Sequence, residues 1–390
     1  MKTVEVPVAY VPLVDAAPLI IAQEMGFAEA EGLALDLVPA SSWSSLRDML
    51  AFGRVDAAHM LSAMPVAMAL GLGGVRQDIS AVSVLSVNGD VIGVSRALED
   101  KMRAKGYFFD FQDPVRAAEV LADVVDGKIT FGVPFPFSMH QELLDYWISN
   151  SALADIDYEV RTVPPPLMAR ALADGDVDAF CVGEPWGSLA VDSRAGALLI
   201  PGNAIWAFSP EKVLGVRTDW AETEPHLLGR LMRAVWKAGR WLKDDDRRGS
   251  ASEILSRARY LNVPAEMIDR ALSGRFTVSG HGEQRDCPHF VVFHNGAANF
   301  PWRSQAKWIG ARLAVRNGLD VRQAMETAGS VFRSDIYRQQ LTGTGAEMPG
   351  ASEKLEGSIL TPTAVASNAG HLSLMKDAFF DGRVFDPLKV

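Results

Sequence analysis

The chain has 390 residues, of which 48% are hydrophobic and 22% are charged, and 38 Lys and Arg stand against 48 Asp and Glu for a net charge of -10. This composition excludes disordered, collagen-like and disulfide-stapled proteins. Single cores stop growing beyond roughly 250–300 residues, so we expect two domains. The acidic balance argues against direct binding of nucleic acid or of an anionic membrane, because both require a basic face.

The first residues show no pattern of an export signal. Met1-Lys2 is followed directly by Thr3–Tyr10, without a basic n-region, an apolar h-region or a small-residue cleavage site. The two cysteines, Cys181 and Cys287, form no CxxC motif and no disulfide framework. These features predict a cytoplasmic location. The uncharged stretch Ala57–Val75 is long enough to suggest a membrane span, but Pro65 within it favours a buried strand followed by a helix.

Strands alternate with helices in chain order. The residue patterns predict strands and helices in turn at Val4–Tyr10, Ala16–Met25, Leu33–Val38, Ser45–Phe52 and Val55–Met60, and again at Ile129–Val133, His140–Ser149, Tyr158–Val163, Leu167–Ala173 and Val177–Val182. This β-α-β-α-β order indicates mostly parallel sheets covered by helices. After residue 220 the chain is predicted to be mainly helical, with helices at Pro225–Leu242, Ser252–Leu261 and Pro264–Leu272.

One sequence pattern occurs twice. Leu50–Ala57 and Leu172–Ala179 share Leu-Ala-x-Gly-x-Val-Asp-Ala, which describes a helix end, a glycine in the left-handed conformation and a strand entering a sheet. The repeated context predicts two similar α/β domains with a ligand cleft between them. Chance recurrence of a common turn is the alternative.

Several segments resemble the nitrate/bicarbonate-binding family of ABC-transporter solute receptors. The resemblance runs along nearly the whole chain and is most specific in two segments, Val-Gly-Glu-Pro-Trp at 182–186 and Asn-Phe-Pro-Trp at 299–302. It implies an α/β, two-lobed class II periplasmic-binding-protein fold in which each lobe is a helix-covered mixed sheet and the ligand cleft lies between the lobes. Residues 1–92 and 212–390 would form lobe 1 with a C-terminal helical part, and residues 93–211 would form lobe 2. The chain would cross between lobes near Val91–Ser95 and Ser209–Val216.

Within that family, the chain is most similar to the cytoplasmic nitrate/nitrite sensors of nitrate-assimilation operons, the NasS type, because it shows no pattern of an export signal. That resemblance implies a nitrate or nitrite ligand, no cofactor and no catalytic residue. It also implies a partner, an RNA-binding antiterminator of the NasT type, which the sensor sequesters and releases on anion binding. Two alternatives remain open: the substrate-binding component of an ABC nitrate or bicarbonate transporter, and an enzyme similar to thiamine-pyrimidine synthases. The cysteine-rich segment expected of the enzyme is absent from the sequence.

Candidate anion-binding residues follow the strands of both predicted lobes. Trp43 lies just before the first turn of a predicted helix, where backbone N–H groups and its indole N–H can hold an anion, and Ser44 and Ser45 are expected to cap that helix. Packing at the lobe edge is the alternative for Trp43. His59 is predicted to line the cleft, with a core histidine as the alternative.

The second predicted lobe offers His140 and two wall residues. Ser138 and Gln141 have the spacing of a capping box, so His140 lies in the first turn of its helix, and the resemblance implies that it contacts nitrate. Gly183 and Pro185 are predicted to line the wall.

Lys212 is the predicted cationic ligand. The resemblance implies that it contacts nitrate, and an ammonium about 4 Å from an anion contributes roughly 4 kcal/mol at an effective dielectric of about 20. The alternative is an exposed turn lysine. Together these residues predict one locally positive pocket in an acidic protein.

A second group of potential ligands carries little weight. Cys287 lies among three histidines, His281, His289 and His294, but their spacing fits no zinc-finger pattern, so a loop is favoured over a metal site.

Overall fold

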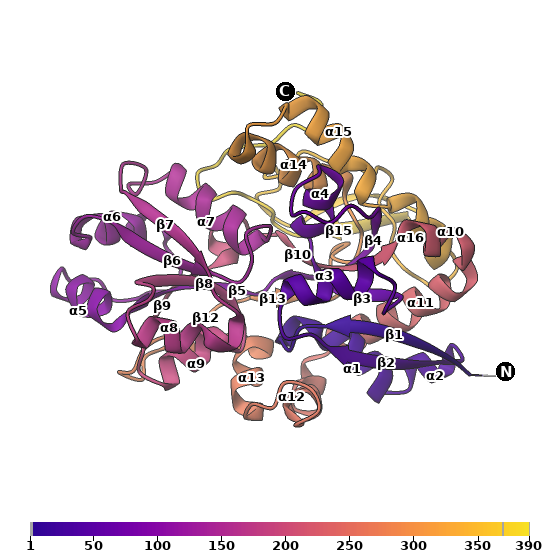
Figure 1. Ribbon diagram of the computed structural model, residues 1–390, viewed down its shortest axis with the longest axis horizontal. Helices are drawn as coiled ribbons and strands as arrows, with labels where there is room; N and C mark the ends of the chain where they lie inside the picture. Colours follow the sequence, from indigo (N-terminus) through magenta and orange to yellow (C-terminus); the bar gives the residue numbers. More distant parts are fainter. Residues whose placement is uncertain (1–2, 369, 390) are drawn as a thin grey trace.

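The structure is a computed structural model that describes residues 3–368 and 370–389. Two mixed sheets organise it, and they lie side by side in Figure 1. The six-stranded sheet has the order β13-β4-β10-β3-β1-β2 and contains β1 (Val4–Tyr10), β2 (Leu33–Pro39), β3 (Ala57–Leu61), β4 (Ile79–Asn88), β10 (Pro210–Arg217) and β13 (Val291–Val292). The five-stranded sheet has the order β7-β6-β8-β5-β9 and contains β5 (Asp90–Ser95), β6 (Ile129–Val133), β7 (Tyr158–Thr162), β8 (Ala179–Gly183) and β9 (Gly196–Pro201).

The two sheets have the same internal order. In the first, β1 pairs in parallel with β2 and β3, and β10 runs antiparallel to β3 and β4. In the second, β6 pairs in parallel with β7 and β8, and β5 runs antiparallel to β8 and β9. The series β2-β1-β3-β10-β4 therefore corresponds to β7-β6-β8-β5-β9. The predicted β-α-β-α-β units are confirmed in both domains.

Helices surround both sheets. Those of the first domain are α1 (Ala17–Glu24), α2 (Phe27–Ala30), α3 (Trp43–Ala51), α4 (Ala63–Ala69), α10 (Thr218–Thr223) and α11 (Pro225–Leu242). Those of the second are α5 (Arg96–Ala104), α6 (Pro114–Val124), α7 (Met139–Ser149), α8 (Met168–Ala173) and α9 (Trp186–Asp192). The later chain adds α12 (Arg248–Ser256), α13 (Ala265–Ser273), α14 (Arg303–Asn317), α15 (Val321–Val331) and α16 (Ser334–Leu341).

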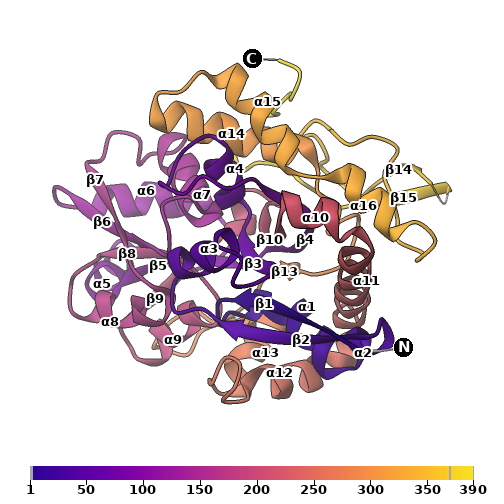
Figure 2. The same cartoon turned by 45° about the vertical axis from the view of Figure 1, so that its right-hand side comes forward.

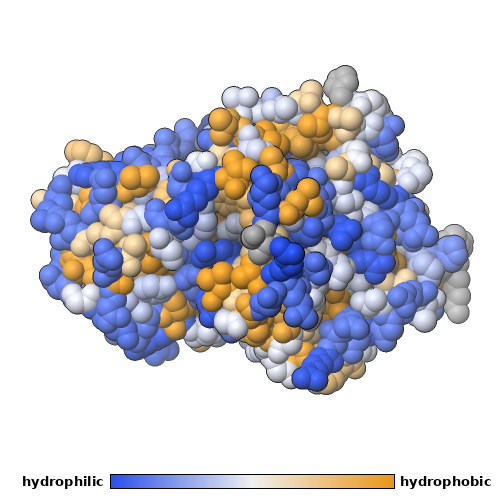
Figure 3. Space-filling view, turned by 90° about the horizontal axis from the view of Figure 1, so that it is seen from above, coloured by the Kyte–Doolittle hydropathy of each residue, from blue (hydrophilic) through white to orange (hydrophobic). Residues whose placement is uncertain are grey.

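Shorter elements complete the fold. The 3-10 helices are η1 (Val14–Ala16), η2 (Pro165–Leu167), η3 (Gly202–Ala204) and η4 (Asp245–Arg247), and the small hairpins are β11 (Arg275–Thr277) with β12 (Gln284–Asp286) and β14 (Thr363–Ser367) with β15 (Gly370–Leu374). The β14–β15 hairpin lies at the edge of the molecule in Figure 2. Seen from above, apolar side chains form several separate patches with hydrophilic side chains between them (Figure 3). None of the described helices is long and apolar enough to cross a membrane.

The repeated sequence pattern forms the same structure twice. Gly53 follows α3 with φ +74° and Gly175 follows α8 with φ +77°, and each leads into the strand beside its sheet's antiparallel strand. Glycine adopts this left-handed conformation without steric cost. The predicted helix end, glycine and strand are confirmed at both positions.

The chain passes between the sheets at Gly89, between β4 and β5, and returns through residues 202–209. The crossing predicted near Val91–Ser95 instead falls inside β5, because Gly89 with φ +112° already makes the turn. The predicted lobe boundaries at 92/93 and 211/212 cut β5 and β10, each of which lies whole in one sheet. The division into lobes otherwise stays a prediction.

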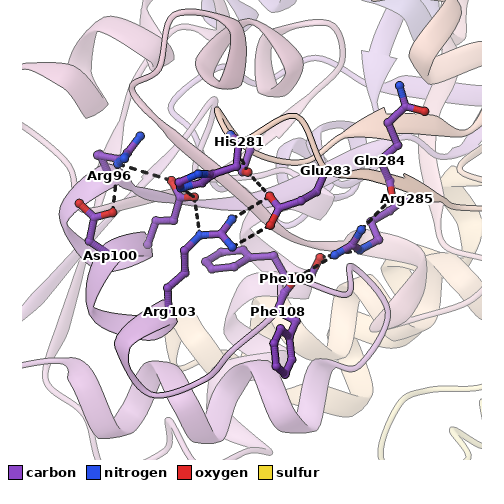
Figure 4. Close-up of polar contacts among 11 residues, drawn as sticks. Arg96, Asp100, Arg103, Phe108, Phe109, His281, Glu283, Gln284 and Arg285 are labelled. Carbon is purple, nitrogen blue, oxygen red and sulfur yellow. Dashed lines mark hydrogen bonds and ion pairs between the residues drawn. The ribbon is translucent and has the colours of Figure 1, made fainter.

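A late segment also packs against the second domain. Figure 4 shows Arg103 of α5 facing Glu283 beside β12, and their atoms form two hydrogen bonds of 2.8 and 2.9 Å. Arg285 donates to the backbone oxygens of Phe108 and Phe109 at 2.9 Å each. Leu198 N–H in β9 donates to Val278 O at 2.8 Å. The β11–β12 hairpin thus ties the later chain to the five-stranded domain, although residues 212–390 were assigned to lobe 1.

Candidate functional site

Lys212 lies at the centre of a buried polar cluster. It belongs to β10, its side chain is fully buried, and its Nζ lies 2.6 Å from Asp15 Oδ2 and donates to Glu211 Oε1 at 2.7 Å. Burial lowers the pKa of Lys212, but the two carboxylates raise it more, so the ammonium stays charged. Lys212 is therefore an interior cation and not an exposed turn residue.

His59 and Trp43 adjoin Lys212 on the first domain. His59 lies in β3, with its Nε2 2.9 Å from Asp15 Oδ1. The Trp43 ring centroid lies 5.7 Å from that of His59 and 5.5 Å from Lys212 Nζ, within the range of a cation–π contact. Burial lowers the pKa of His59 more than Asp15 raises it, so the imidazole is neutral at neutral pH.

His140 reaches the cluster from the second domain. It is the second residue of α7, and Ser138 Oγ caps this helix by accepting from Gln141 N–H at 3.2 Å, as predicted. His140 Nδ1 lies 3.3 Å from Glu211 Oε1. A Cβ placed on Gly183 would lie 3.6 Å from His140 Nε2 and 3.7 Å from Asp15 Oδ2. The structure thus brings Trp43, His59, His140, Gly183 and Lys212 together.

Pro185 lies beside this cluster in a loop that touches the first domain. Val14 N–H donates to Glu184 O at 2.9 Å, and Trp186 Nε1 donates to Pro12 O at 3.1 Å. These contacts press the β8–α9 loop against the segment that carries Asp15. Pro185 therefore contributes backbone position, and no direct contact between it and Lys212 or His140 is among those found in the described residues.

The cap of α3 differs from the prediction. Ser42, not Ser44 or Ser45, is the N-cap, because its Oγ accepts from Ser45 N–H at 3.2 Å and Trp43 is already the first helical residue. The helix begins earlier than expected, since Ser42 has the extended conformation that a cap needs. Trp43 is consequently buried within the first turn, with 1% of its surface exposed.

Three carboxylates were not foreseen. Besides Asp15 and Glu211, Asp90 in β5 is fully buried, with Cys181 Sγ 3.7 Å from its Oδ2. Burial raises the pKa of Asp90 to about 6 and that of Glu211 to about 8, although Lys212 lowers both. Burial also raises the pKa of Asp15, but Lys212 and His59 outweigh it and hold that carboxyl well below its usual range.

The expectation of a locally positive pocket needs correction for this reason. Lys212 is the one Lys or Arg of this cluster among the described residues, and Asp15 at 2.6 Å already offsets its charge. An ion pair attracts an anion far less than an isolated ammonium does, so the attraction of about 4 kcal/mol that an unpaired lysine offers is an upper bound. The cluster offers directed N–H donors more than net positive charge.

Two of those donors are free of hydrogen bonds within the described chain. Trp43 Nε1 and His140 Nε2 are buried and without a hydrogen-bond partner there. Trp206 Nε1, Trp241 Nε1 and Trp302 Nε1 are also unpaired, so a lone indole is not diagnostic. Convergence of Trp43 and His140 on Lys212 from two domains distinguishes this site, because a buried polar group without a partner is costly unless a ligand or water completes it.

Sequence reasoning had weak signals for the missed acids. Glu211 is adjacent to Lys212, and Asp90 follows the Asn88-Gly89 turn, but nothing in the pattern indicates that either side chain points inward. Asp15 directly precedes the predicted helix Ala16–Met25, which is a typical place for a helix-starting residue, whereas it lies in η1 and faces His59. Their proximity arises from contacts between segments far apart in the chain.

Other parts of the molecule offer less. Cavities of about 490 and 740 Å³ lie elsewhere and contain none of the six predicted site residues. The cavity of about 740 Å³ is lined by arginines that already have hydrogen-bond partners; Arg333, for example, donates to Asp335 at 2.7 and 2.9 Å. Within the part of the chain that the structure describes, no group of three or more His, Cys, Asp or Glu is arranged to hold a metal ion.

Comparison with known proteins gives relatives that are named for nitrate binding or for bicarbonate transport. The chain is 26% identical over 403 residues to the nitrate/nitrite binding protein NrtA of Nostoc sp. (strain PCC 7120), covering all of this chain and 84% of the relative. It is 34% identical over 317 residues to the bicarbonate transport ATP-binding protein CmpC of Synechococcus elongatus, covering 80% of this chain and 45% of the relative. The chain spans about half the length of the ATP-binding relatives that it matches.

The fold has a clear counterpart among solved structures. The crystal structure of the periplasmic nitrate-binding protein NrtA from Synechocystis PCC 6803 superposes with a TM-score of 0.83 at 25% identity, covering 99% of this chain and 96% of the other. The predicted α/β two-domain periplasmic-binding-protein-like fold is confirmed. The relatives that match nearly the whole chain are solute receptors and not enzymes. Residues 1–256, about two-thirds of the sequence, match the NMT1-like family, and the chain belongs to it.

Proposed function

We propose that this chain is a nitrate- or nitrite-binding receptor and that the anion binds among Trp43, His59, His140, Gly183 and Lys212. The observation that carries the proposal is the convergence of Lys212, Trp43 and His140 in one buried cluster built from both domains. The NrtA relatives, which match nearly the whole chain, support a small planar anion as the ligand.

The donors of the cluster suit nitrate. The ion is planar and has three acceptor oxygens, and the Lys212 ammonium has three donors, of which Asp15 and Glu211 occupy two. The third is available to an oxygen, Trp43 Nε1 supplies a second donor, and His140 supplies another through its Nε2 tautomer. Burial lowers the pKa of His140 well below its usual range, so it offers a neutral N–H.

The sequence left two biological roles open, sensing and transport, and the names of the relatives favour transport. We propose that the chain acts as the substrate-binding component of an ABC nitrate transporter, because its relatives are named as nitrate binding proteins and transport proteins. The sensor role, with a cytoplasmic location and a NasT-type antiterminator partner, stays a prediction. Copurification with and without nitrate tests it: release of a bound protein by nitrate supports a sensor, and unchanged composition supports the transport role.

Titration calorimetry with nitrate, nitrite, bicarbonate and sulfate tests the ligand. We expect nitrate or nitrite to bind in the micromolar range, about 8 kcal/mol, and sulfate not to bind. Trp43→Phe keeps an aromatic side chain but removes the unpaired N–H together with the five-membered part of the indole, so affinity should fall about 5- to 20-fold. Trp302→Phe removes an equally unpaired indole N–H outside the cluster and should leave affinity unchanged.

Two results would overturn the assignment. Equal effects of Trp43→Phe and Trp302→Phe on affinity would contradict this assignment of the anion site, because only the first substitution changes the cluster. Binding of bicarbonate alone would redirect the ligand to the other anion named among the relatives.

A further inference from the structure

The buried cluster contains three carboxyl groups but only one permanent cation among the described residues. Its titratable groups come from six elements around Lys212, and none exposes more than 3% of its surface: Asp15 on η1, His59 on β3, Asp90 on β5, His140 on α7, Cys181 on β8, and Glu211 with Lys212 on β10. Lys212 is its one permanent cation among the described residues. Asp15 already balances that charge at 2.6 Å, which leaves Asp90 and Glu211 without a second cation.

A further negative charge in this space is unfavourable. Charges without compensation are costly to hold in a buried environment, and a site reduces that cost by neutralising a group. The ligand of the proposed function carries one negative charge and would lie beside Lys212. Either a carboxylate of the cluster takes up a proton when the anion binds, or two anionic groups remain unpaired inside the protein.

We propose that the site binds its anion together with one proton, and that Asp90 takes up this proton at neutral pH. The proposal rests on the proposed function for the identity of the anion. The proton comes from the buffer and adds to a carboxylate oxygen of Asp90, and no bond of the anion forms or breaks.

Asp90 is the group best placed to change state. One of its oxygens lies 3.7 Å from Cys181 Sγ, and the other, Oδ1, is buried and without a hydrogen bond in the described residues. In strand register Asp90 lies opposite Gly183, whose Cβ position is within 3.7 Å of both His140 and Asp15. The carboxylate is closely packed, because a Cβ on Gly202 would lie 2.0 Å from Asp90 Oδ1, but among the described residues its one side-chain hydrogen bond is the weak one from Cys181 Sγ.

The remaining groups are less suited. Asp15 contacts both Lys212 and His59 and stays ionised. Burial raises the pKa of Glu211 to about 8, so it already holds its proton at pH 7. Burial lowers the pKa of His59 and His140, and it raises that of Cys181 well above its usual range. The two imidazoles and the thiol are therefore neutral at pH 7.

The pH dependence has a definite sign. Asp90, whose pKa burial raises to about 6, is mostly ionised in the free protein above that pH and protonated below it. An anion nearby raises its pKa further, so uptake is expected between about pH 6 and 8 and vanishes near pH 5. Linkage then weakens affinity as pH rises, by at most tenfold per pH unit for each proton. Above pH 8, ionisation of Glu211 should steepen the loss.

Calorimetry in several buffers measures the proton directly. Nitrate is titrated at pH 7.5 and pH 5 in buffers of different ionisation enthalpy, with EDTA present, and the slope of observed against buffer enthalpy gives the protons taken up. We expect about one at pH 7.5 and about zero at pH 5. Nitrate binding without uptake at pH 7.5 overturns the proposal and leaves the proposed function intact. Failure to bind either nitrate or nitrite anywhere from pH 5 to 8 overturns the proposed function instead.

Asp90→Asn tests the assignment of the proton. The variant should bind nitrate with little uptake at pH 7.5 and with an affinity nearly constant between pH 6 and 7.5. Asp123→Asn changes an exposed carboxylate that pairs with Lys105 at 2.7 Å, and it should behave as the parent protein does. Unchanged uptake in Asp90→Asn overturns the role of Asp90. Should Asp90→Asn fail to fold, the buffer series on the parent protein still decides whether a proton binds.

Discussion

The two domains place opposite charges at equivalent positions. The offset between Gly53 and Gly175 relates His59 to Cys181 and Leu61 to Gly183. Lys212 of β10 pairs with Leu61, and Asp90 of β5 pairs with Gly183, each on the antiparallel strand beside the repeated unit. Lys212 and Asp90 are therefore counterparts, one a cation and the other a carboxylate.

The difference shows how one backbone plan produces two electrostatic environments. In the first domain, Asp15 lies 2.9 Å from His59 and 2.6 Å from Lys212, which holds its pKa below the usual range. In the second, Asp90 has the weak Sγ contact of Cys181, and burial raises its pKa to about 6. The adjacent cation keeps Asp15 ionised, whereas Asp90 has no adjacent cation among the described residues and therefore holds its proton to a higher pH.

Removing the cation should have the largest effect. Lys212→Met keeps most of the volume and leaves Asp15 buried without its ammonium, so we expect a loss of about 3–5 kcal/mol in the free energy of unfolding at pH 7. The loss should shrink toward pH 4, where Asp15 can be protonated. Urea denaturation at both pH values measures it. Lys389→Met, at an exposed lysine, should change stability by less than about 0.5 kcal/mol, and equal losses would contradict the central position of Lys212.

Whereas Lys212→Met should destabilise the protein, Asp90→Asn should stabilise it at high pH. The pKa of Asp90, raised to about 6 from 3.8, means that its contribution to stability is present below pH 3.8 and lost as pH rises through 6. The variant lacks this loss and should be more stable than the parent by about 1–3 kcal/mol at pH 8, with little difference at pH 4. Thermal unfolding of both proteins between pH 4 and pH 8 measures how this stability difference grows with pH. A gap that does not change with pH would show that Asp90 is not protonated in the folded protein.

His59→Cys makes the first repeat resemble the second. Lys212 still pairs with Asp15, so the cost is mainly that of a smaller buried side chain, about 1–3 kcal/mol. The pKa of His59 is lowered by burial, so the parent loses stability as pH falls below 6.5, because the unfolded chain takes up the proton. The gap between parent and variant should therefore narrow from pH 7 to pH 5 in chemical denaturation. A widening gap would mean that His59 is charged in the folded protein.

Local patterns predicted much of this architecture, and long-range contacts account for what they missed. The strands Val4–Tyr10 and Ile129–Val133 and the helix Pro225–Leu242 lie where the patterns placed them, because alternation, caps and periodicity are local properties. The candidate residues Trp43, His59, His140, Gly183 and Lys212 do meet. Asp15, Asp90 and Glu211 were missed, since facing Lys212 or Cys181 depends on register between strands distant in sequence.

The glycines that revealed the repeat offer the smallest and most closely matched test. Gly53 and Gly175 have φ +74° and +77°, so alanine at either position should cost about 1–2 kcal/mol through backbone conformation. A Cβ at Gly53 would lie 3.7 Å from the Arg217 guanidinium, an ordinary contact, and one at Gly175 would meet nothing within 4 Å. The two losses in urea denaturation should therefore agree within about 0.5 kcal/mol.

Gly249→Ala is the matched control. Gly249 lies in α12 with open space around it and without a positive φ, so alanine there should stabilise the protein by up to about 1 kcal/mol. A loss at Gly53 well above that at Gly175 would point to Arg217, whose Nη1 donates to Leu50 O at 3.2 Å and Val55 O at 2.9 Å across the turn. The equivalence of the two repeats would then hold for the backbone but not for its energetics, because Arg217 of β10 bridges the first turn, whereas the second has Arg161 of β7, which donates to Asp176 O at 2.9 Å.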